Sequence, residues 1–291
     1  MMSPMLNWTM IEGRASMLKQ RVFTAVILVA LFLWLLLSLS ATDFSLVIML
    51  LVMVAGWEWT NLLKLGNVAA RTGYLTALFL LLGAAGYSLG LFGEFDFALG
   101  QQISLIAVGL WAVIFLWLQG YPSSAILWSP KPVLGLIGLI LLVATWVALA
   151  SILHRDSGRW LLLLAIVIVV LADVGGYIAG RLFGKHKLAP IVSPGKTWEG
   201  FIGGMFLQLL LIAGLLWARP EFSPLALSIL IIPVALYSVL GDLFESMVKR
   251  HSGVKDSSQL LPGHGGVLDR IDGIMAALPL FSLLLAQSSF V

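Results

Sequence analysis

Residues 160–183 read WLLLLAIVIVVLADVGGYIAGRLF, and this stretch decides the class of fold. A helix crosses a bilayer with about 20 consecutive, mostly apolar residues. Similar runs lie at roughly 22–41, 44–63, 73–92, 102–120, 133–153, 200–218, 224–245 and 271–290. These runs do not alternate apolar and polar residues as the strands of a membrane barrel do. We therefore expect an all-α, polytopic integral membrane protein with about nine transmembrane helices.

The composition of the whole chain agrees with a membrane protein. Of the 291 residues, 60% are hydrophobic and 11% are charged, and the mean hydropathy is +1.03. Soluble domains carry about 25% charged residues. The chain has no cysteine, which excludes disulfides, thiolate nucleophiles and cysteine-based zinc sites.

The first residues look foreign to the rest of the chain. Residues 11–14 spell IEGR, the recognition sequence of a restriction protease that is used to remove expression tags. Met17 then follows like a natural start. We interpret residues 1–16 as an expression-tag remnant and leave them out of the functional argument.

The rest of the chain divides unevenly in polar content. Residues 17–153 contain few charged side chains, and we expect them to form an N-terminal transmembrane scaffold. Tryptophans at span ends, namely Trp57, Trp59, Trp117 and Trp128, are typical of an aromatic belt at the membrane surface. Glu58 is interpreted as an acid at the membrane interface that reaches water or Arg71. We expect 154–291 to be the catalytic region, with cytoplasmic loops 184–199 and 246–270.

The basic residues predict the orientation, because short cytoplasmic loops are rich in Lys and Arg. With the N-terminus inside, thirteen Lys and Arg residues fall on the inner side, and only Arg155, Arg159 and Arg219 fall outside. We therefore expect an N-in/C-out protein of the bacterial inner membrane whose polar loops face the cytoplasm. Anionic membrane lipids and soluble phosphates account for the basic inner face, so no nucleic-acid partner is expected.

From residue 160 onward, charged residues lie inside or directly beside apolar runs in three places, and the first of these contains Asp173. A charge at that depth costs several kcal/mol unless it is paired or wet, so we expect Asp173 to be functional. Gly176, Gly180 and Gly184 follow at intervals of four residues and predict close helix packing.

The stretch VSPGKTWEGF, residues 192–201, contains a second polar group. Gly195-Lys196-Thr197 is not a P-loop, because Pro190 stands where the upstream glycine is expected and no strand precedes it. Ser193, Lys196 and Thr197 come just before a new span, where helix N–H groups favour an anion. Ser193 or Thr197 can equally serve as a simple helix cap, whereas Lys196 suits a phosphate.

The third polar group begins in the span at 224–245. Asp242, Glu245, Ser246, Lys249 and Arg250 recur at helical spacing and share one face. This polar face is expected to run from the membrane into the cytoplasm.

A segment that we expect to be flexible comes next and carries Lys255, Asp256 and the PGHGG run at 262–266. Asp269 and Asp272 then begin the last span. Together with Asp242 they predict a hard-oxygen site of the kind Mg²⁺ accepts along with substrate phosphates. Capping of the helix dipole is the simpler alternative for these two acids.

This inventory favours phosphoryl or nucleotidyl transfer. Acids for a divalent cation stand beside lysines and arginines for phosphates, and no Ser-His-Asp or cysteine arrangement for acyl transfer is present. Catalysis of phosphoryl transfer depends mostly on positioning and charge neutralisation. At a membrane surface, one partner is expected to be a lipid that bears a phosphate.

Residues 246–272 read SMVKRHSGVKDSSQLLPGHGGVLDRID and resemble the signature of the phosphatidate cytidylyltransferase (CDP-diacylglycerol synthase) family. Residues 185–201, KHKLAPIVSPGKTWEGF, resemble its bacterial members. The resemblance implies conversion of CTP and phosphatidic acid to CDP-diacylglycerol and pyrophosphate by a homodimer. It also implies dependence on Mg²⁺ and a second cation beside it, which can be monovalent, such as K⁺.

The resemblance also implies roles for individual residues. Asp242 and Asp269 would ligate the metal, with Asp272 ligating or supporting them. Further catalytic residues would be Lys249, Arg250, Asp256 and His264. Substrate-binding residues would be Asp173, Ser193, Lys196, Thr197, Ser246, Lys255, Gly265, Gly266 and Arg270. We expect the stretch 246–272 to close over the CTP phosphates, with its glycines allowing close backbone approach.

Two alternatives compete with this interpretation. An ion-coupled transporter would use Asp173, Glu58 and Asp242 as an intramembrane relay, but no inverted repeat is evident in the sequence. A phosphatidyltransferase that consumes a CDP-lipid would carry an acidic motif similar to LDRIDG at 268–273. Such enzymes have two spaced pairs of acids, and only one pair is present here.

Overall fold

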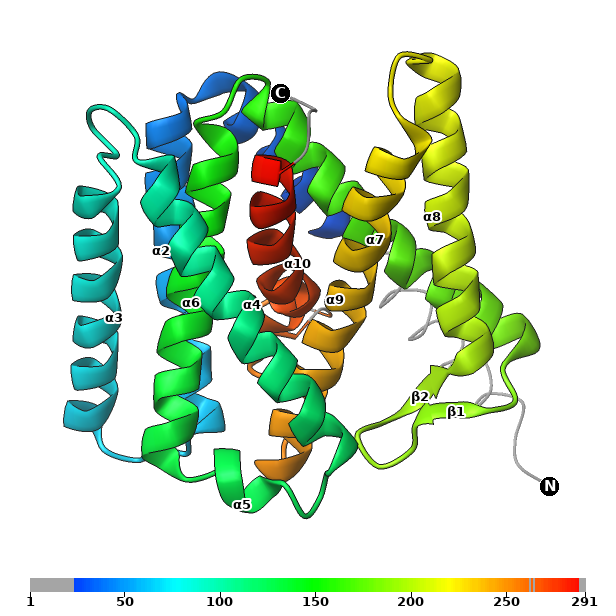
Figure 1. The fold of residues 1–291 in the computed structure, drawn as a ribbon. Coiled ribbons are helices and arrows are strands. Elements are labelled where there is room, and N and C mark those ends of the chain that lie inside the picture. Colours follow the sequence, from blue (N-terminus) through cyan, green and yellow to red (C-terminus); the bar gives the residue numbers. More distant parts are fainter. Residues whose placement is uncertain (1–23, 262, 264, 288–291) are drawn as a thin grey trace, which may run out of the picture.

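The computed structural model describes residues 24–261, 263 and 265–287 as a bundle of helices (Figure 1). Seven described helices are long and apolar enough to cross a membrane: α2 (Ala41–Leu62), α3 (Val68–Ser88), α4 (Phe97–Gln119), α6 (Lys131–Leu153), α7 (Gly158–Phe183), α8 (Trp198–Ala218) and α9 (Pro224–His251). The described chain also contains an apolar helix at Thr24–Ser38, the short α5 (Ala125–Trp128) and α10 (Leu268–Gln287). The predicted polytopic, all-α fold is confirmed. The count of nine spans and the orientation stay predictions, and the proposed tag lies outside the described residues.

Side chains at the helix starts show why the helices begin where they do. Ser40, Asn67, Asp96, Thr197 and Ser223 each accept a hydrogen bond from a backbone N–H in the first turn of the following helix. Such an N-cap stabilises a helix by about 1 kcal/mol because those N–H groups have no partner inside the helix.

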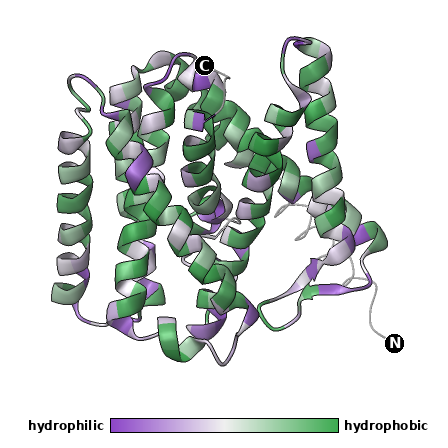
Figure 2. Cartoon of the chain, in the orientation of Figure 1, coloured by the Kyte–Doolittle hydropathy of each residue, from purple (hydrophilic) through white to green (hydrophobic). Residues whose placement is uncertain are grey.

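Helix α6 forms the centre of the bundle. In its most apolar window, 72% of the residues are buried, against 11% in α3 and 17% in α8. Figure 1 shows α3 and α8 at opposite edges of the bundle. Their exposed side chains are largely apolar, for example Leu80 and Leu210, and hydrophobic colouring covers the outer helices in Figure 2. An apolar exterior of this kind suits contact with lipid rather than water.

Glycines bring α7 and α8 into close contact. A Cβ atom on Gly175 would lie 2.7 Å from the carbonyl oxygen of Gly203, and one on Gly180 would lie 3.5 Å from the Cα atom of Gly200. A Cβ on Gly184 would meet the side chain of Thr197. The predicted packing role is thereby confirmed for Gly180 and Gly184, whereas that of Gly175 was not predicted.

A small antiparallel hairpin connects α7 to α8 and was not predicted from the sequence. Strand β1 (Lys187–Ala189) pairs with β2 (Ser193–Thr197), with Lys187 opposite Thr197. Glu199, in the first turn of α8, accepts hydrogen bonds from the backbone N–H groups of Lys185 at 3.1 Å and His186 at 3.2 Å. The hairpin is thus tied to α8 and lies at the same end of the bundle as α5 (Figure 1).

Two tryptophans that were assigned to the aromatic belt belong to the core instead. Trp59 and Trp128 are fully buried, and the indole N–H of Trp59 donates to the carbonyl oxygen of Leu134 at 3.1 Å. The belt interpretation is wrong for these two residues, because each indole packs between helices. Trp57, by contrast, is 38% exposed.

Candidate active site

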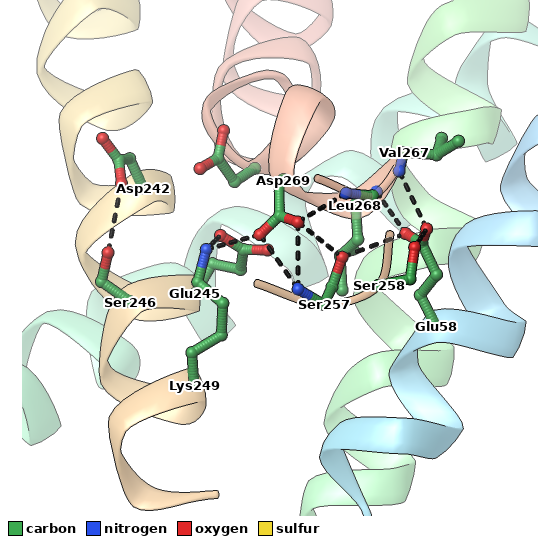
Figure 3. A network of polar contacts seen from close by, with 12 residues as sticks. Glu58, Asp242, Glu245, Ser246, Lys249, Ser257, Ser258, Val267, Leu268 and Asp269 are labelled. Carbon is green, nitrogen blue, oxygen red and sulfur yellow. Dashed lines mark hydrogen bonds and ion pairs between the residues drawn. The ribbon is translucent and has the colours of Figure 1, made fainter. Parts of the chain in front are cut away.

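The polar face of α9 forms as its helical spacing predicts. Ser246 Oγ donates to Asp242 Oδ1 at 3.3 Å, one turn back along the helix. In the same way, Lys249 Nζ lies 2.5 Å from Glu245 Oε2. Figure 3 shows both pairs on the side of α9 that faces the start of α10.

Lys249 joins two helices through buried carboxylates. Its ammonium group also lies 2.6 Å from Asp269 Oδ1, in the first turn of α10. The Glu245 side chain is fully buried and that of Asp269 is 5% exposed. Glu245 Oε1 has no hydrogen-bond partner within the described part of the chain. One lysine therefore lies between two buried acids, a formal excess of one negative charge.

Asp269 is also held by the loop that precedes α10. Its Oδ2 atom accepts hydrogen bonds from the backbone N–H of Ser257 at 3.0 Å, from the Ser257 hydroxyl at 2.9 Å and from the backbone N–H of Gly266 at 2.7 Å. With Lys249 on its other oxygen, the Asp269 carboxylate has a fixed orientation (Figure 3).

Glu58 lies in this network rather than reaching water or Arg71. It is fully buried on α2, and its carboxylate accepts hydrogen bonds from Ser258 Oγ at 2.6 Å and from the backbone N–H of Leu268 at 2.6 Å. Arg71 does not reach it, because the Arg71 Nε–H donates to the carbonyl oxygen of Leu65. The expectation that Glu58 reaches water or Arg71 is wrong. The signal that could have found it was an acid inside an apolar span, which needs a partner.

A second ion pair lies in the lining of a polar pocket beside the hairpin. Lys196 Nζ, on β2, lies 2.5 Å from Asp242 Oδ2 on α9. The pocket has a volume of about 510 Å³, and Asp173, Ser193 and Lys196 are among its lining residues. Asp173 interacts electrostatically with Asp242 and Lys196. The structure thus brings two regions that are distant in the sequence to the same pocket.

Asp272 connects this pocket to the Lys249 network. It interacts electrostatically with Asp242 and Asp173, which line the pocket, and with Lys249. Its Oδ1 atom accepts a hydrogen bond from the backbone N–H of Gly273 at 2.7 Å. Five acids, Asp173, Asp242, Glu245, Asp269 and Asp272, therefore form one charged cluster with Lys196, Lys249 and Arg270. We call these eight residues the charged cluster.

Several residues that were predicted for the site have other surroundings. Lys255 and Asp256 are exposed. Arg270 is also exposed but belongs to the charged cluster through its electrostatic interaction with Asp173. The Arg250 Nε–H donates to the carbonyl oxygen of Val192 at 3.4 Å. His264 lies outside the described residues, so its predicted role stays a prediction.

Thr197 is the N-cap of α8, and its Oγ1 atom accepts a hydrogen bond from the N–H of Gly200 at 3.1 Å. Of the two residues considered for this cap, the structure selects Thr197. Thr197 also contributes to the lining of the polar pocket, so the capping role does not remove it from the candidate site.

The glycines before α10 allow a tight local structure. Gly263 and Gly265 have φ angles of +75° and +81°, which residues with a Cβ rarely adopt. At Gly266, a Cβ atom would collide with Ser257 Oγ and Glu58 Oε1. The N–H of Gly266 donates to Asp269 in this structure, and an additional role toward an anion stays a prediction.

Comparison with known proteins gives a consistent family assignment. A family model described as "Cytidylyltransferase family" matches residues 19–288. A Haemophilus influenzae protein is 40% identical over 285 residues, which cover 91% of this chain and 98% of the relative. A Pseudomonas aeruginosa protein is 37% identical over 272 residues, which cover 92% of this chain and 97% of the relative. A Staphylococcus haemolyticus protein is 37% identical over 276 residues, which cover 93% of this chain and 100% of the relative. All three are named phosphatidate cytidylyltransferase.

The fold and the charged cluster together define a polytopic helical membrane protein with a polar site between α9, α10 and the hairpin. The extent of these matches shows that the chain belongs to the phosphatidate cytidylyltransferase family and is an enzyme. The resemblance seen in the signature at 246–272 is thereby confirmed.

Proposed function

We propose that this enzyme converts CTP and phosphatidic acid to CDP-diacylglycerol and pyrophosphate. The observation that carries the proposal is that the polar pocket adjoins a second, apolar cavity. Leu188, Phe201 and Val239 line both. A site with one charged and one apolar compartment suits a substrate that has a phosphate head and hydrocarbon chains.

The apolar cavity has a volume of about 970 Å³ and lies between α4, the hairpin and α9. Phe115, Leu116, Ile191 and Leu240 are among its lining residues. The acyl chains of phosphatidic acid would occupy this cavity, which places the lipid phosphate near Lys196. A lysine at this point supplies a compact positive charge for a phosphate.

The reaction is a single in-line displacement and requires no protein nucleophile. A phosphate oxygen of the lipid attacks the α-phosphorus of CTP, the bond between that phosphorus and the oxygen bridging to the β-phosphate breaks, and pyrophosphate leaves. Lys196 and Lys249 would hold phosphate oxygens of the two substrates. Lys249 already bridges two carboxylates and Lys196 is paired with one, so the substrates would share cations that the protein has positioned in advance.

The charged cluster fits a divalent cation in its chemistry. It contains five acids and three basic groups, a formal excess of two negative charges. Within the described ranges no three His, Asp or Glu side chains form a complete metal cage, but Mg²⁺ commonly binds through one or two carboxylates, waters and substrate phosphates. Asp242 and Asp269 would hold Mg²⁺, with Asp272 ligating it or supporting these two acids, and a monovalent cation such as K⁺ would lie beside it. When bound, the metal would neutralise charge on the reacting phosphates.

The cellular setting belongs to the same proposal. The excess of Lys and Arg in the predicted inner loops supports a bacterial inner-membrane enzyme whose site faces the cytoplasm, where CTP is present. The enzyme is proposed to act as a homodimer, as the family resemblance implies.

The test uses purified protein in mixed micelles with Mg²⁺, phosphatidic acid and CTP radiolabelled at the α-phosphate. The proposal expects label in the lipid fraction together with unlabelled pyrophosphate. Release of CMP only from a preformed CDP-lipid would support a phosphatidyltransferase instead. Absence of both reactions, combined with ion flux in liposomes, would support a transporter.

A further inference from the structure

Glu58 is a buried carboxylate to which the proposed chemistry gives no role. It belongs to α2, in the half of the chain that was predicted to be scaffold, yet it contacts residues about 200 positions later in the sequence. We propose that Glu58 is a positioning residue that holds the loop between α9 and α10 (residues 252–267, the signature loop) so that Asp269 faces Lys249. Its catalytic consequence rests on the proposed function.

The two oxygens of the Glu58 carboxylate contact both serine hydroxyls and backbone N–H groups. Oε1 accepts hydrogen bonds from Ser258 Oγ at 2.6 Å and from the Val267 N–H at 2.9 Å. Oε2 accepts from the Leu268 N–H at 2.6 Å and lies 3.3 Å from Ser257 Oγ. Each oxygen therefore has one backbone N–H donor and one serine hydroxyl beside it, and the single proton of the Ser257 hydroxyl is shared between Glu58 and Asp269 (Figure 3).

The two backbone N–H groups lie where α10 begins. Leu268 is the first residue of that helix, and N–H groups in a first turn have no partner within the helix. The negative charge of Glu58 also interacts favourably with the positive end of the helix dipole. Among the described residues, no basic side chain forms an ion pair with Glu58. Its charge is therefore balanced by dipoles that belong to the signature loop and α10.

Ser257 transmits the position of Glu58 to the charged cluster. Its hydroxyl lies between Glu58 Oε2 and Asp269 Oδ2, at 3.3 Å and 2.9 Å, and its N–H donates to Asp269 at 3.0 Å. A Cβ atom on Gly266 would not fit between Ser257 and Glu58. The contact between α2 and the loop is therefore dense, and a shift of Glu58 would move the donors that orient Asp269.

Other parts of α2 support the same attachment. Asn61 Nδ2 donates to the carbonyl oxygen of Ser257 at 3.3 Å, and Ser252 Oγ donates to the carbonyl oxygen of Leu62 at 2.8 Å. Three successive points on one face of α2 thus hold the signature loop. Among these three residues of α2, Glu58 alone also contacts α10. A substitution of Glu58 therefore affects the position of Asp269, while Asn61 and Leu62 still attach the loop to α2.

The change Glu58→Gln tests the proposal because it keeps the shape of the side chain. An amide has one acceptor oxygen and one NH₂ donor, so either the Val267 N–H or the Leu268 N–H would face another donor. We expect kcat to fall by about 10- to 100-fold, as for residues that orient metal ligands, with a much smaller change in the KM for CTP. Glu94→Gln, the same change at an exposed acid, is the matched control and should leave kcat unchanged.

A spin label reports on the loop independently of catalysis. The chain has no cysteine, and Leu260 is 50% exposed, so a nitroxide on Leu260→Cys samples the signature loop directly. Glu58→Gln should make this label more mobile while the thermal midpoint shows that the protein is folded. Full kcat in Glu58→Gln, or unchanged label mobility in the folded variant, would overturn the proposal.

Two further variants decide the matter if Glu58→Gln does not fold. Ser257→Ala and Ser258→Ala each remove one hydroxyl and leave the N–H groups of Val267 and Leu268 paired with Glu58. Because Ser258 Oγ also accepts a hydrogen bond from the Leu260 N–H at 3.1 Å, the mobility of the label on residue 260 is compared in Ser257→Ala only. Lower kcat together with a more mobile label would support the proposal, and wild-type kcat in both would reject it. A wild-type protein that makes no CDP-lipid would reject the proposed function, whereas the label would still show whether Glu58 holds the loop.

Discussion

Lys249 and Asp269 form an ion pair of 2.6 Å that joins α9 to α10 where both helices meet the signature loop. Twenty residues separate them in the sequence, and Glu245 shares the same ammonium group at 2.5 Å. Because both carboxylates are buried, this lysine affects stability as well as chemistry.

Lys249→Met should destabilise the protein strongly. The substitution leaves Glu245 and Asp269 without their shared cation, and breaking a buried ion pair in this way costs about 3–5 kcal/mol. The measurement is the thermal midpoint in detergent, with exposed Lys131→Gln as the control. Equal midpoints for Lys249→Met and the wild type would show that the buried acids need no such cation.

Lys196→Gln should weaken lipid binding more than stability. Lys196 is 24% exposed beside the polar pocket, and a hydrogen bond to a charged group contributes about 1.5–3 kcal/mol. The KM for phosphatidic acid should therefore rise about tenfold or more while the thermal midpoint changes little. Lys187→Gln, on the same hairpin but outside the lining of both cavities, is the matched control. An unchanged KM would remove Lys196 from the proposed phosphate site.

Val239→Phe should obstruct the junction between the polar pocket and the apolar cavity, which Val239 lines on both sides. We expect the KM for long-chain phosphatidic acid to rise about tenfold, equivalent to about 1.4 kcal/mol, while that for CTP stays constant. Val170→Phe, on a lipid-exposed part of α7, is the control. If both variants behave alike, the acyl chains bind elsewhere.

Gly265→Ala and Gly266→Ala should both lower activity, for different reasons. At Gly265 the φ angle of +81° makes a Cβ unfavourable, at a cost of about 1–3 kcal/mol. At Gly266 the new methyl group would collide with Glu58 and Ser257. Gly214→Ala is the control, because nothing lies within 4 Å of a Cβ there. Turnover and thermal midpoint are measured on the same preparations, and normal turnover in both variants would make the loop a simple connection.

Cysteine labelling tests the predicted orientation. Leu260 and Phe92 are exposed and lie on opposite predicted sides of the membrane. An impermeant thiol reagent applied to intact cells should label Phe92→Cys and not Leu260→Cys. The reverse pattern would invert the proposed topology.

Local features of the site could be predicted from the sequence. The pairs Asp242–Ser246 and Glu245–Lys249 follow from helical spacing, because residues four apart share a face. The packing of α7 on α8 follows from the spacing of its glycines. The side-chain pairs on α9 and the packing of α7 on α8 involve residues that are near one another in the sequence. Local sequence spacing is therefore enough to predict them.

Other features depend on contacts that no local pattern encodes. Glu58 and Leu268 are 210 residues apart, and hydropathy alone does not show which face of α2 meets the signature loop. Buried Trp59 resembled a membrane-surface tryptophan because lipid-facing and protein-facing side chains are equally apolar. The β2 strand contains Pro194 and Gly195, which are rare in strands, and so it was not predicted.

The most direct test of the account compares wild-type protein with Asp269→Asn for transfer of label from the α-phosphate of CTP to phosphatidic acid. The variant keeps the shape of the side chain but loses the charge that pairs with Lys249 and would hold the metal, at an expected cost of several kcal/mol in transition-state stabilisation. The account predicts labelled CDP-lipid from the wild type and a loss of orders of magnitude in the variant, which should still insert and purify. Near-normal turnover of Asp269→Asn at saturating Mg²⁺ would contradict it.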